Sequence, residues 1–242
     1  MKIVLEIAVF SIEAAIQAID AGADRIEYCE NPLEGGTTPS YGSLQLIQPY
    51  LSKVPIFPII RPRGGDFLYS KNEFECIKED LKITRDLGFP GAVIGMLQND
   101  GTVDIDRTAE LVSIAGSDME LTFHRAFDRA LDPFKALEAI VQSGCKRILT
   151  SGQVPNASDA ISLLRQLQEQ ASNRIIIMPG SGVRATNVKF IVDQTGVSEI
   201  HSSARKMVAS SMLYQKESMK ENLQSTLVDV TEIELMQKAL QS

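Results

Sequence analysis

Short apolar runs alternate with helix-like patterns along nearly the whole chain, and this alternation limits the fold more than any other feature. Eight apolar runs are expected to be strands: residues 3–9, 25–29, 55–61, 91–96, 119–124, 147–150, 174–178 and 198–203. Helices are expected between them: residues 11–21, 43–52, 71–87 and 104–115, a helix that opens at 132–133 and ends at 144, and residues 158–170 and 184–195. This strand count predicts a single-domain TIM-type (β/α)8 barrel.

An open, doubly wound sheet is the main alternative for such a pattern. That fold normally places a glycine-rich phosphate loop after the first strand. Here the first strand runs into Phe10, Ser11 and Ile12 instead, which favours the barrel.

The length of 242 residues and the 44% hydrophobic content suit one barrel domain over residues 1–242, with a less regular C-terminal segment, 206–242. Thr231 and Glu234 have the spacing of a capping box, so residues 232–240 are expected to form the eighth helix. The polar, methionine-containing stretch before it is expected either to cover a mouth of the barrel or to pack on a second subunit.

Composition excludes several classes of function. The net charge is −7 without any Lys/Arg run, so no nucleic-acid partner is expected. The three cysteines, Cys29, Cys76 and Cys145, lie far apart without a Cys-x-x-Cys motif, which argues against a disulfide framework or a closed zinc site. Glu6 interrupts the apolar N-terminus and no run is long enough for a membrane span, so a cytoplasmic protein without a membrane partner is expected.

A rigid, positively charged turn follows the third strand. Arg61 and Arg63 flank Pro62, then come Gly64, Gly65 and Asp66, and Ser70 with Glu73 predicts a capping box that opens the next helix. Arginine is the usual partner of carboxylates and phosphates, so Arg61, Arg63 and Asp66 are candidates for an anion-binding corner. The alternative is a purely structural Arg61–Asp66 ion pair.

Charged side chains are predicted inside the barrel. Side chains alternate along a strand, and the outward face must be apolar because helices cover it. This rule places inside the barrel Glu6, Glu27, Cys29, Arg61, Thr122, His124, Glu199, His201 and Ser203. Glu6, Glu27, His124 and His201 are therefore candidates for acid–base catalysis, since buried ionisable groups at the C-terminal ends of barrel strands commonly form active sites. A structural Glu/Arg/His network is the alternative.

The loops after the later strands add candidates for anion binding. They carry Arg125 after the fifth strand, Thr150 and Ser151 after the sixth, Gly180 and Gly182 after the seventh, and Ser203 and Arg205 after the eighth. Glycine-rich turns at this end of a barrel can direct backbone N–H groups at a phosphate.

Six motifs together resemble the CutC family of copper homeostasis proteins. They are residues 27–29 (Glu-Tyr-Cys), 34–40 (Glu-Gly-Gly-Thr-Thr-Pro-Ser), 60–67 (Ile-Arg-Pro-Arg-Gly-Gly-Asp-Phe), 122–128 (Thr-Phe-His-Arg-Ala-Phe-Asp), 147–152 (Arg-Ile-Leu-Thr-Ser-Gly) and 201–205 (His-Ser-Ser-Ala-Arg). The resemblance implies a TIM-type barrel, a cytoplasmic homo-oligomer, with a dimer favoured, and copper handling with Cu(I) bound through cysteine. Cys29 matches the family's cysteine at the end of the second strand.

One position departs from the family pattern. Ala8 stands where the family often has a second cysteine, which leaves Cys29 without a neighbouring thiolate. Cu(I) prefers thiolate and thioether ligands, so Met96, Met178 or the two histidines would have to complete a site. Two functions are therefore expected: a copper homeostasis protein with Cys29 as metal ligand, or an enzyme acting on a small phosphorylated or carboxylated substrate at the C-terminal mouth of the barrel.

Overall fold

Parallel strands and helices alternate in the order that the sequence pattern predicts. The computed structural model describes residues 2–241, and its barrel strands are β1 (Val4–Val9), β2 (Arg25–Tyr28), β3 (Ile56–Pro58), β4 (Gly91–Ile94), β5 (Glu120–Phe123), β6 (Arg147–Thr150), β7 (Ile176–Pro179) and β8 (Glu199–Ser202). The helices are α1 (Ile12–Asp20), α2 (Tyr41–Ile47), α3 (Lys71–Asp86), α4 (Ile105–Ala115), α5 (Pro133–Ser143), α6 (Ile161–Ala171), α7 (Val188–Thr195) and α8 (Val230–Gln241).

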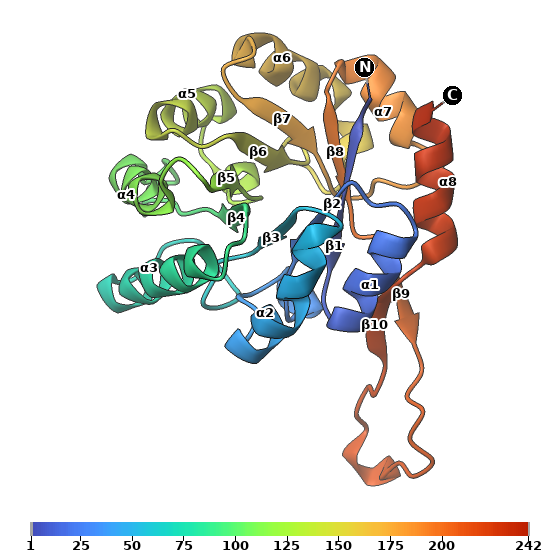
Figure 1. The fold of residues 1–242 in the computed structure, drawn as a ribbon. Helices are drawn as coiled ribbons and strands as arrows, with labels where there is room; N and C mark the ends of the chain where they lie inside the picture. The colour runs from blue at the N-terminus through green and yellow to red at the C-terminus, as the bar shows by residue number, and fades with distance from the viewer. Residues whose placement is uncertain (1, 242) are drawn as a thin grey trace.

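The strands form two four-stranded arcs that together make a ring. One arc has the order β3-β2-β1-β8, so the first and last barrel strands are hydrogen-bonded neighbours, and the other has the order β4-β5-β6-β7. The arcs meet where Ile59 forms a bridge with Val93, and where β7 packs beside β8. Helices surround the strands (Figure 1). The architecture confirms the predicted TIM-type (β/α)8 barrel.

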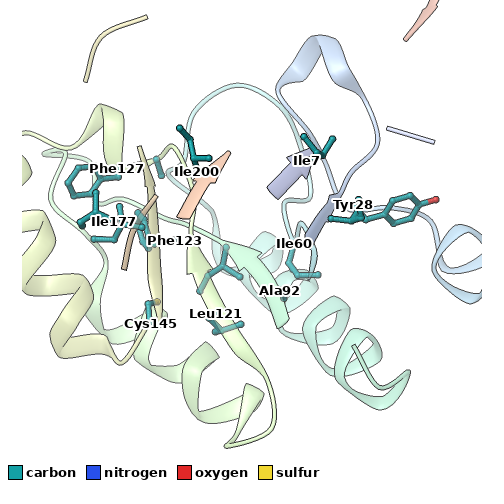
Figure 2. Packing of buried hydrophobic residues seen from close by; sticks show 14 of the residues in the cluster. Ile7, Tyr28, Ile60, Ala92, Leu121, Phe123, Phe127, Cys145, Ile177 and Ile200 are labelled. Atoms are coloured by element: carbon teal, nitrogen blue, oxygen red, sulfur yellow. The ribbon is translucent and has the colours of Figure 1, made fainter. Parts of the chain in front are cut away.

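Two separate apolar clusters hold the barrel together. The larger one fills the layer between strands and helices, and Figure 2 shows part of it, with Ile7, Tyr28 and Ile200 pointing away from the barrel interior. The smaller one lies inside the barrel and is made of Cys29, Phe57, Ile59 and Val93. Side chains on both faces of most strands are buried. The strands therefore contribute to the layer under the helices on one face and to the barrel interior on the other.

Several helices begin at short polar side chains that accept hydrogen bonds from the first backbone N–H groups of the helix. The Ser70–Glu73 capping box of α3 is formed as predicted, and Asp132 accepts the first amides of α5. The helix expected over residues 43–52 instead begins at Tyr41, capped by Ser40, and continues as a 3₁₀ turn over Gln48–Ser52. The predicted capping box of the last helix is wrong: the carboxylate of Asp229 accepts the Glu232 amide, so the helix begins at Val230.

A long antiparallel hairpin separates the barrel from α8. β9 (Arg205–Val208) pairs with β10 (Ser225–Val228), and the connecting chain extends far from the barrel (Figure 1). We call residues 205–228 the arm. None of the helices within residues 2–241 is both long enough and apolar enough to span a membrane.

Candidate functional site

A pocket of about 400 Å³ opens at the C-terminal ends of the strands. Glu27 from β2 and His201 from β8 line it, as do Arg61 and His124, which follow β3 and β5. The loops after β7 and β8 add Gly182, Arg184, Ser203 and Arg205 to its wall. The pocket therefore lies where TIM-barrel enzymes bind their substrates.

A chain of buried ion pairs fills the barrel below this pocket. Arg25 bridges Glu6 and Glu199, and Arg147 contacts Glu199 at 3.0 Å and the half-exposed Glu120 at 2.7 Å. The sequence interpretation missed both arginines, although alternation along β2 and β6 places them inside: Arg25 is two residues before Glu27, and Arg147 is two before Leu149. Glu199 is paired with both arginines, and one carboxylate oxygen of Glu6 is paired with Arg25. Both carboxylates therefore have structural partners.

Glu6, His201 and Glu27 form a row that leads from the ion pairs into the pocket. Nδ1 of His201 lies 2.8 Å from Glu6, and its Nε2 lies 3.8 Å from Glu27. Burial disfavours charge on all three groups. For Glu6, the positive charge of Arg25 and the hydrogen bond from His201 outweigh burial and hold the carboxyl pKa well below its usual range. For His201, the hydrogen bond to Glu6 and the charge of Glu27 outweigh burial and raise the pKa of the imidazole.

Glu27 differs from Glu6 because it has no arginine of its own. Burial raises the pKa of its carboxyl to about 7, and the negative charge of Glu6 adds to this shift, while the charge of His201 opposes it. A carboxyl group that titrates near neutral pH is suited to both accepting and donating a proton. Glu27 is therefore the candidate general acid–base residue of the pocket.

His124 presents a neutral imidazole to the same pocket. Its Nδ1 accepts the amide of Ala126 at 3.1 Å, which places the proton of the neutral ring on Nε2. Burial, followed by the positive charge of Arg61, lowers its pKa to about 3. Space for the ring is provided by Gly95, since a Cβ there would lie 2.4 Å from Nδ1.

Buried polar side-chain atoms without a hydrogen-bond partner are rare within the described residues 2–241. Three occur: Arg61 Nε, the Tyr69 hydroxyl and His124 Nε2. Arg61 and Tyr69 lie beside each other, so a small movement can pair them. His124 Nε2–H is likewise a buried donor without a partner, and His124 is among the residues that line the pocket.

The structure separates the two arginines that follow β3. Arg61 is buried, and its guanidinium donates to the carbonyl oxygens of Gly36 and Gly65 at 2.9 Å each. The structural alternative of an Arg61–Asp66 ion pair is wrong, because Asp66 accepts from Arg63 at 2.9 Å. Arg63 also pairs with Glu73, so Arg63 and Asp66 hold the loop outside the pocket lining.

The residues after β5 and β6 form one hydrogen-bonded wall. Arg125 lines the pocket and is held by Asp128 at 2.7 Å and by the hydroxyls of Ser151 and Ser181. Asp128 in turn accepts from Thr150 and from the Ser151 amide. Thr150 and Ser151 thus position Arg125 from behind the lining.

The two predicted glycines of the β7 loop have different positions. Gly180 lies behind the surface of the pocket, where a Cβ would come within 2.5 Å of Leu149 and 3.1 Å of His201. Gly182 forms part of the lining and has a φ of +68°, so a side chain there would be strained. Arg184, which follows in the same loop, also lines the pocket, although sequence analysis did not single it out.

Cys29 is a poor ligand for a soft metal in this arrangement. Its thiol is 1% exposed and packs on Phe57, Ile59 and Val93 beneath the pocket lining. Burial and the neighbouring Glu27 carboxylate raise its pKa well above the usual thiol value, which disfavours the thiolate that Cu(I) requires. Met178 directs its sulfur at Arg25 and Met96 packs in the outer core. Within residues 2–241, no three His, Cys, Asp or Glu side chains are placed to hold a metal ion. The donor set does not fit a resident Cu(I).

Fold and pocket together define a TIM-barrel protein with buried glutamate and histidine side chains at a pocket on the C-terminal face of the strands. The model of the CutC family matches residues 3–206, and the chain belongs to that family. A family protein CutC of Chromobacterium violaceum is 47% identical over 216 residues, covering 89% of this chain and 87% of the relative. A family protein CutC of Photorhabdus laumondii is 49% identical over 212 residues, covering 88% and 84% of the two chains.

Solved structures agree with this assignment. The putative copper homeostasis protein CutC of Streptococcus agalactiae is similar with a TM-score of 0.79 and 32% identity, over 83% of this chain and 98% of that chain. Phosphoribosyl anthranilate isomerase of Thermotoga maritima has a TM-score of 0.62 at 13% identity, over 99% and 98% of the two chains, which shows a shared fold only.

Proposed function

We propose that this protein is an enzyme that catalyses proton transfer next to a carbonyl group of a small anionic substrate. The observation that carries the proposal is that one pocket is lined by a candidate proton acceptor and by a candidate hydrogen-bond donor. Glu27 titrates near neutral pH, and His124 offers an unpartnered, neutral N–H donor. A base with a matched pKa and a donor for a developing oxyanion are the two parts that such a reaction needs.

The proposed proton transfer begins at the Glu27 carboxylate. Glu27 removes a proton from the carbon beside the substrate carbonyl, so that the C–H bond breaks and a Glu27 O–H bond forms. The electron pair of the C–H bond forms a C=C bond, and the carbonyl oxygen becomes an oxyanion that accepts from His124 Nε2–H. When the deprotonated carbon carries a hydroxyl group, Glu27 returns the proton to the former carbonyl carbon. The hydroxyl proton moves to the oxyanion and the C–O bond that it leaves becomes the new carbonyl, which completes an isomerisation without any external oxidant or reductant.

The remaining lining residues have binding roles in this proposal. Arg184 and Arg205, with Gly182 and Ser203, supply positive charge and polar groups for a phosphate or carboxylate of the substrate. His201, held by Glu6, sets the electrostatic environment of Glu27. Burial, together with the charge of Arg61, keeps His124 neutral, and Arg61 also supports the wall of the pocket.

The experiment is a ligand screen followed by an isotope measurement. Sugar phosphates and small keto acids are tested for an increase in the melting temperature, and those that stabilise the protein are incubated with it in D2O. Enzyme-dependent incorporation of deuterium beside the carbonyl, lost in Glu27→Gln, supports the proposal. Exchange that continues unchanged in Glu27→Gln contradicts it.

Copper handling in the cytoplasm is the second candidate function. Family membership and the name of the Streptococcus agalactiae relative favour it, with Cys29 as the main Cu(I) ligand. Cys29 is buried, its raised pKa favours the protonated thiol, and Gly36 lies against its sulfur, so this function requires the loop over residues 31–37 to open. An anaerobic Cu(I) competition titration tests it: stoichiometric binding that disappears in Cys29→Ser supports copper handling, and binding unchanged by that substitution opposes it.

A further inference from the structure

Three consecutive backbone N–H groups in the loop after β7 have no hydrogen-bond acceptor within residues 2–241. They belong to Ser181, Gly182 and Val183, all of which line the pocket. The carbonyl oxygens of the same residues all accept hydrogen bonds, from the Ala157 amide at 3.0 Å, the Asn187 side chain at 2.9 Å and the Ser202 hydroxyl at 2.8 Å. The loop is therefore held through its carbonyl groups, and its donors remain available.

The direction of these peptide groups follows from their planarity. The C=O and N–H of a trans peptide point in opposite directions, so the amides of Gly182 and Val183 point away from the groups that hold the loop. Ser181 and Gly182 have positive φ angles of +79° and +68°, which curls the backbone at this point. Successive N–H groups in such a turn form a concavity that binds anions.

The loop after β8 adds further donors beside this turn. The amide and the hydroxyl of Ser203 have no hydrogen-bond partner in the described part of the chain, and Ser203 lines the pocket. The guanidinium groups of Arg184 and Arg205 line the same side, and neither has a carboxylate or carbonyl partner among residues 2–241, whereas Arg125 is paired with Asp128. Two positive charges without a counter-ion attract an anion, although the whole chain carries −7.

We propose that these groups bind the phosphate of a phosphate monoester, so that the substrate is a phosphorylated carbonyl compound rather than a carboxylate. We call residues 181–184, Ser203 and Arg205 the donor wall. The carbonyl part of this inference rests on the proposed function, and the donor wall adds the identity of the anion.

The number of donors favours phosphate over carboxylate. The three loop amides, with the amide and the hydroxyl of Ser203, make five neutral donors, and the two arginines add charged ones. A carboxylate offers two oxygens and accepts about four hydrogen bonds. A phosphate monoester offers three strong acceptor oxygens and a charge of about −1.5 to −2 at neutral pH. Phosphate therefore matches the donor wall in both hydrogen bonds and charge.

The donor wall lies between the two groups that the proposed reaction uses. Glu27 is on β2, two strands from β8, and His124 follows β5, two strands from β7. The pocket volume of about 400 Å³ is near the lower end of the range for small-molecule sites. A phosphate at the donor wall thus leaves the rest of a small molecule to extend across the mouth toward Glu27 and His124.

The first experiment compares two three-carbon ligands by isothermal titration calorimetry. Glycerol phosphate carries a phosphate and glycerate carries a carboxylate, and we expect glycerol phosphate to bind about tenfold more tightly or better. Arg184→Gln should weaken binding of glycerol phosphate by about 10- to 100-fold, and Ser203→Ala by about 2- to 10-fold. Arg165→Gln, at an exposed arginine on α6 outside the pocket, is the matched control and should bind as the wild type does. Equal affinity for the two ligands, or affinity unchanged in Arg184→Gln with Ser203→Ala, overturns the proposal.

A hydrogen-exchange measurement tests the amides directly. Saturating inorganic phosphate should slow exchange of the N–H groups of residues 181–183, because each gains an acceptor. The Ser117 amide is the matched control, since it also has no acceptor within residues 2–241 but lies between α4 and β5, at the opposite end of the barrel. Exchange at residues 181–183 that is no slower with phosphate than without it overturns the proposal.

The phosphate site and the proposed proton transfer can fail separately. Binding of glycerol phosphate that depends on Arg184 and Ser203, without deuterium exchange in any phosphorylated carbonyl compound, supports the phosphate site and contradicts the proton transfer. Deuterium exchange in a keto acid without phosphate, by a protein that binds no glycerol phosphate, supports the proton transfer and overturns the phosphate site.

Discussion

The carboxylate of Glu6 lies 2.8 Å from Nδ1 of His201, and the two residues are direct partners in the pairing of β1 with β8. Closure of the barrel therefore creates this contact, since the residues are 195 positions apart in the chain. Glu6 holds His201 with its other nitrogen toward Glu27, so the contact between His201 and the pocket residue Glu27 depends on the register of the closing strands.

Glu6→Gln should lower the pKa of His201, because the substitution removes the hydrogen-bonded negative charge that raises it. The same change deprives Arg25 of a buried partner and should destabilise the fold by about 3–5 kcal/mol. NMR titration of the His201 ring and denaturant unfolding measure the two effects. Glu120→Gln, at the half-exposed end of the same ion-pair chain, is the control and should leave the His201 pKa nearly unchanged.

Glu27 should make the free energy of unfolding fall as the pH rises toward neutrality. The folded pKa of about 7 is above the ordinary value of 4.5, so the folded state binds the Glu27 proton more tightly than the unfolded state. The contribution is complete below pH 4.5 and is lost as the pH rises through about 7. Subtracting the Glu27→Gln profile from the wild-type profile in denaturant unfolding isolates it, and identical slopes would contradict the predicted shift.

His124 should behave in the opposite direction at acid pH. Its folded pKa of about 3 is below the ordinary 6.5, so its contribution is present above pH 6.5 and is lost as the pH falls toward 3. Nitrogen-15 NMR should show a neutral ring with the proton on Nε2 throughout the neutral range. For turnover of a substrate found in the screen, His124→Ala should reduce kcat by about 10²–10³-fold, with partial recovery in His124→Gln, which keeps an N–H donor.

The cysteines should differ sharply in reactivity. Cys76 is exposed, whereas Cys29 and Cys145 are buried and burial raises the pKa of both thiols. A thiol reagent should therefore modify one cysteine per native chain and all three after unfolding. Cys76→Ser should abolish labelling of the native protein. Rapid native labelling of Cys29 would show that the thiol is accessible and would favour the copper-handling alternative.

Strand alternation predicted much of the barrel and its polar interior, because an outer face covered by helices has to be apolar. Glu6, Glu27, Glu199 and His201 lie inside as that rule requires. The same rule places Arg25 inside the barrel, because it lies two residues before Glu27 on β2, so the sequence contained enough information to predict its position.

Other features depend on contacts that only the folded chain creates. Arg61 is held by carbonyl oxygens of the loop over residues 31–37, and the neutral state of His124 follows from burial beside Arg61. Residues 209–224 of the arm contain no glycine or proline, so the sequence there lacks the turn signal that predicts a hairpin. In each case the deciding partner is distant in sequence or the local signal is weak.

The ionisation of Glu27 is the most direct test of the proposed acid–base site. Carbon-13 NMR of the glutamate carboxyl groups, with Glu27→Gln to assign the signal, gives its midpoint without knowledge of a substrate. A midpoint near 7 is the predicted result, and it should fall back toward the ordinary range if the pocket is opened to water. A midpoint close to 4.5 in the native protein would contradict a buried general acid–base residue at this pocket.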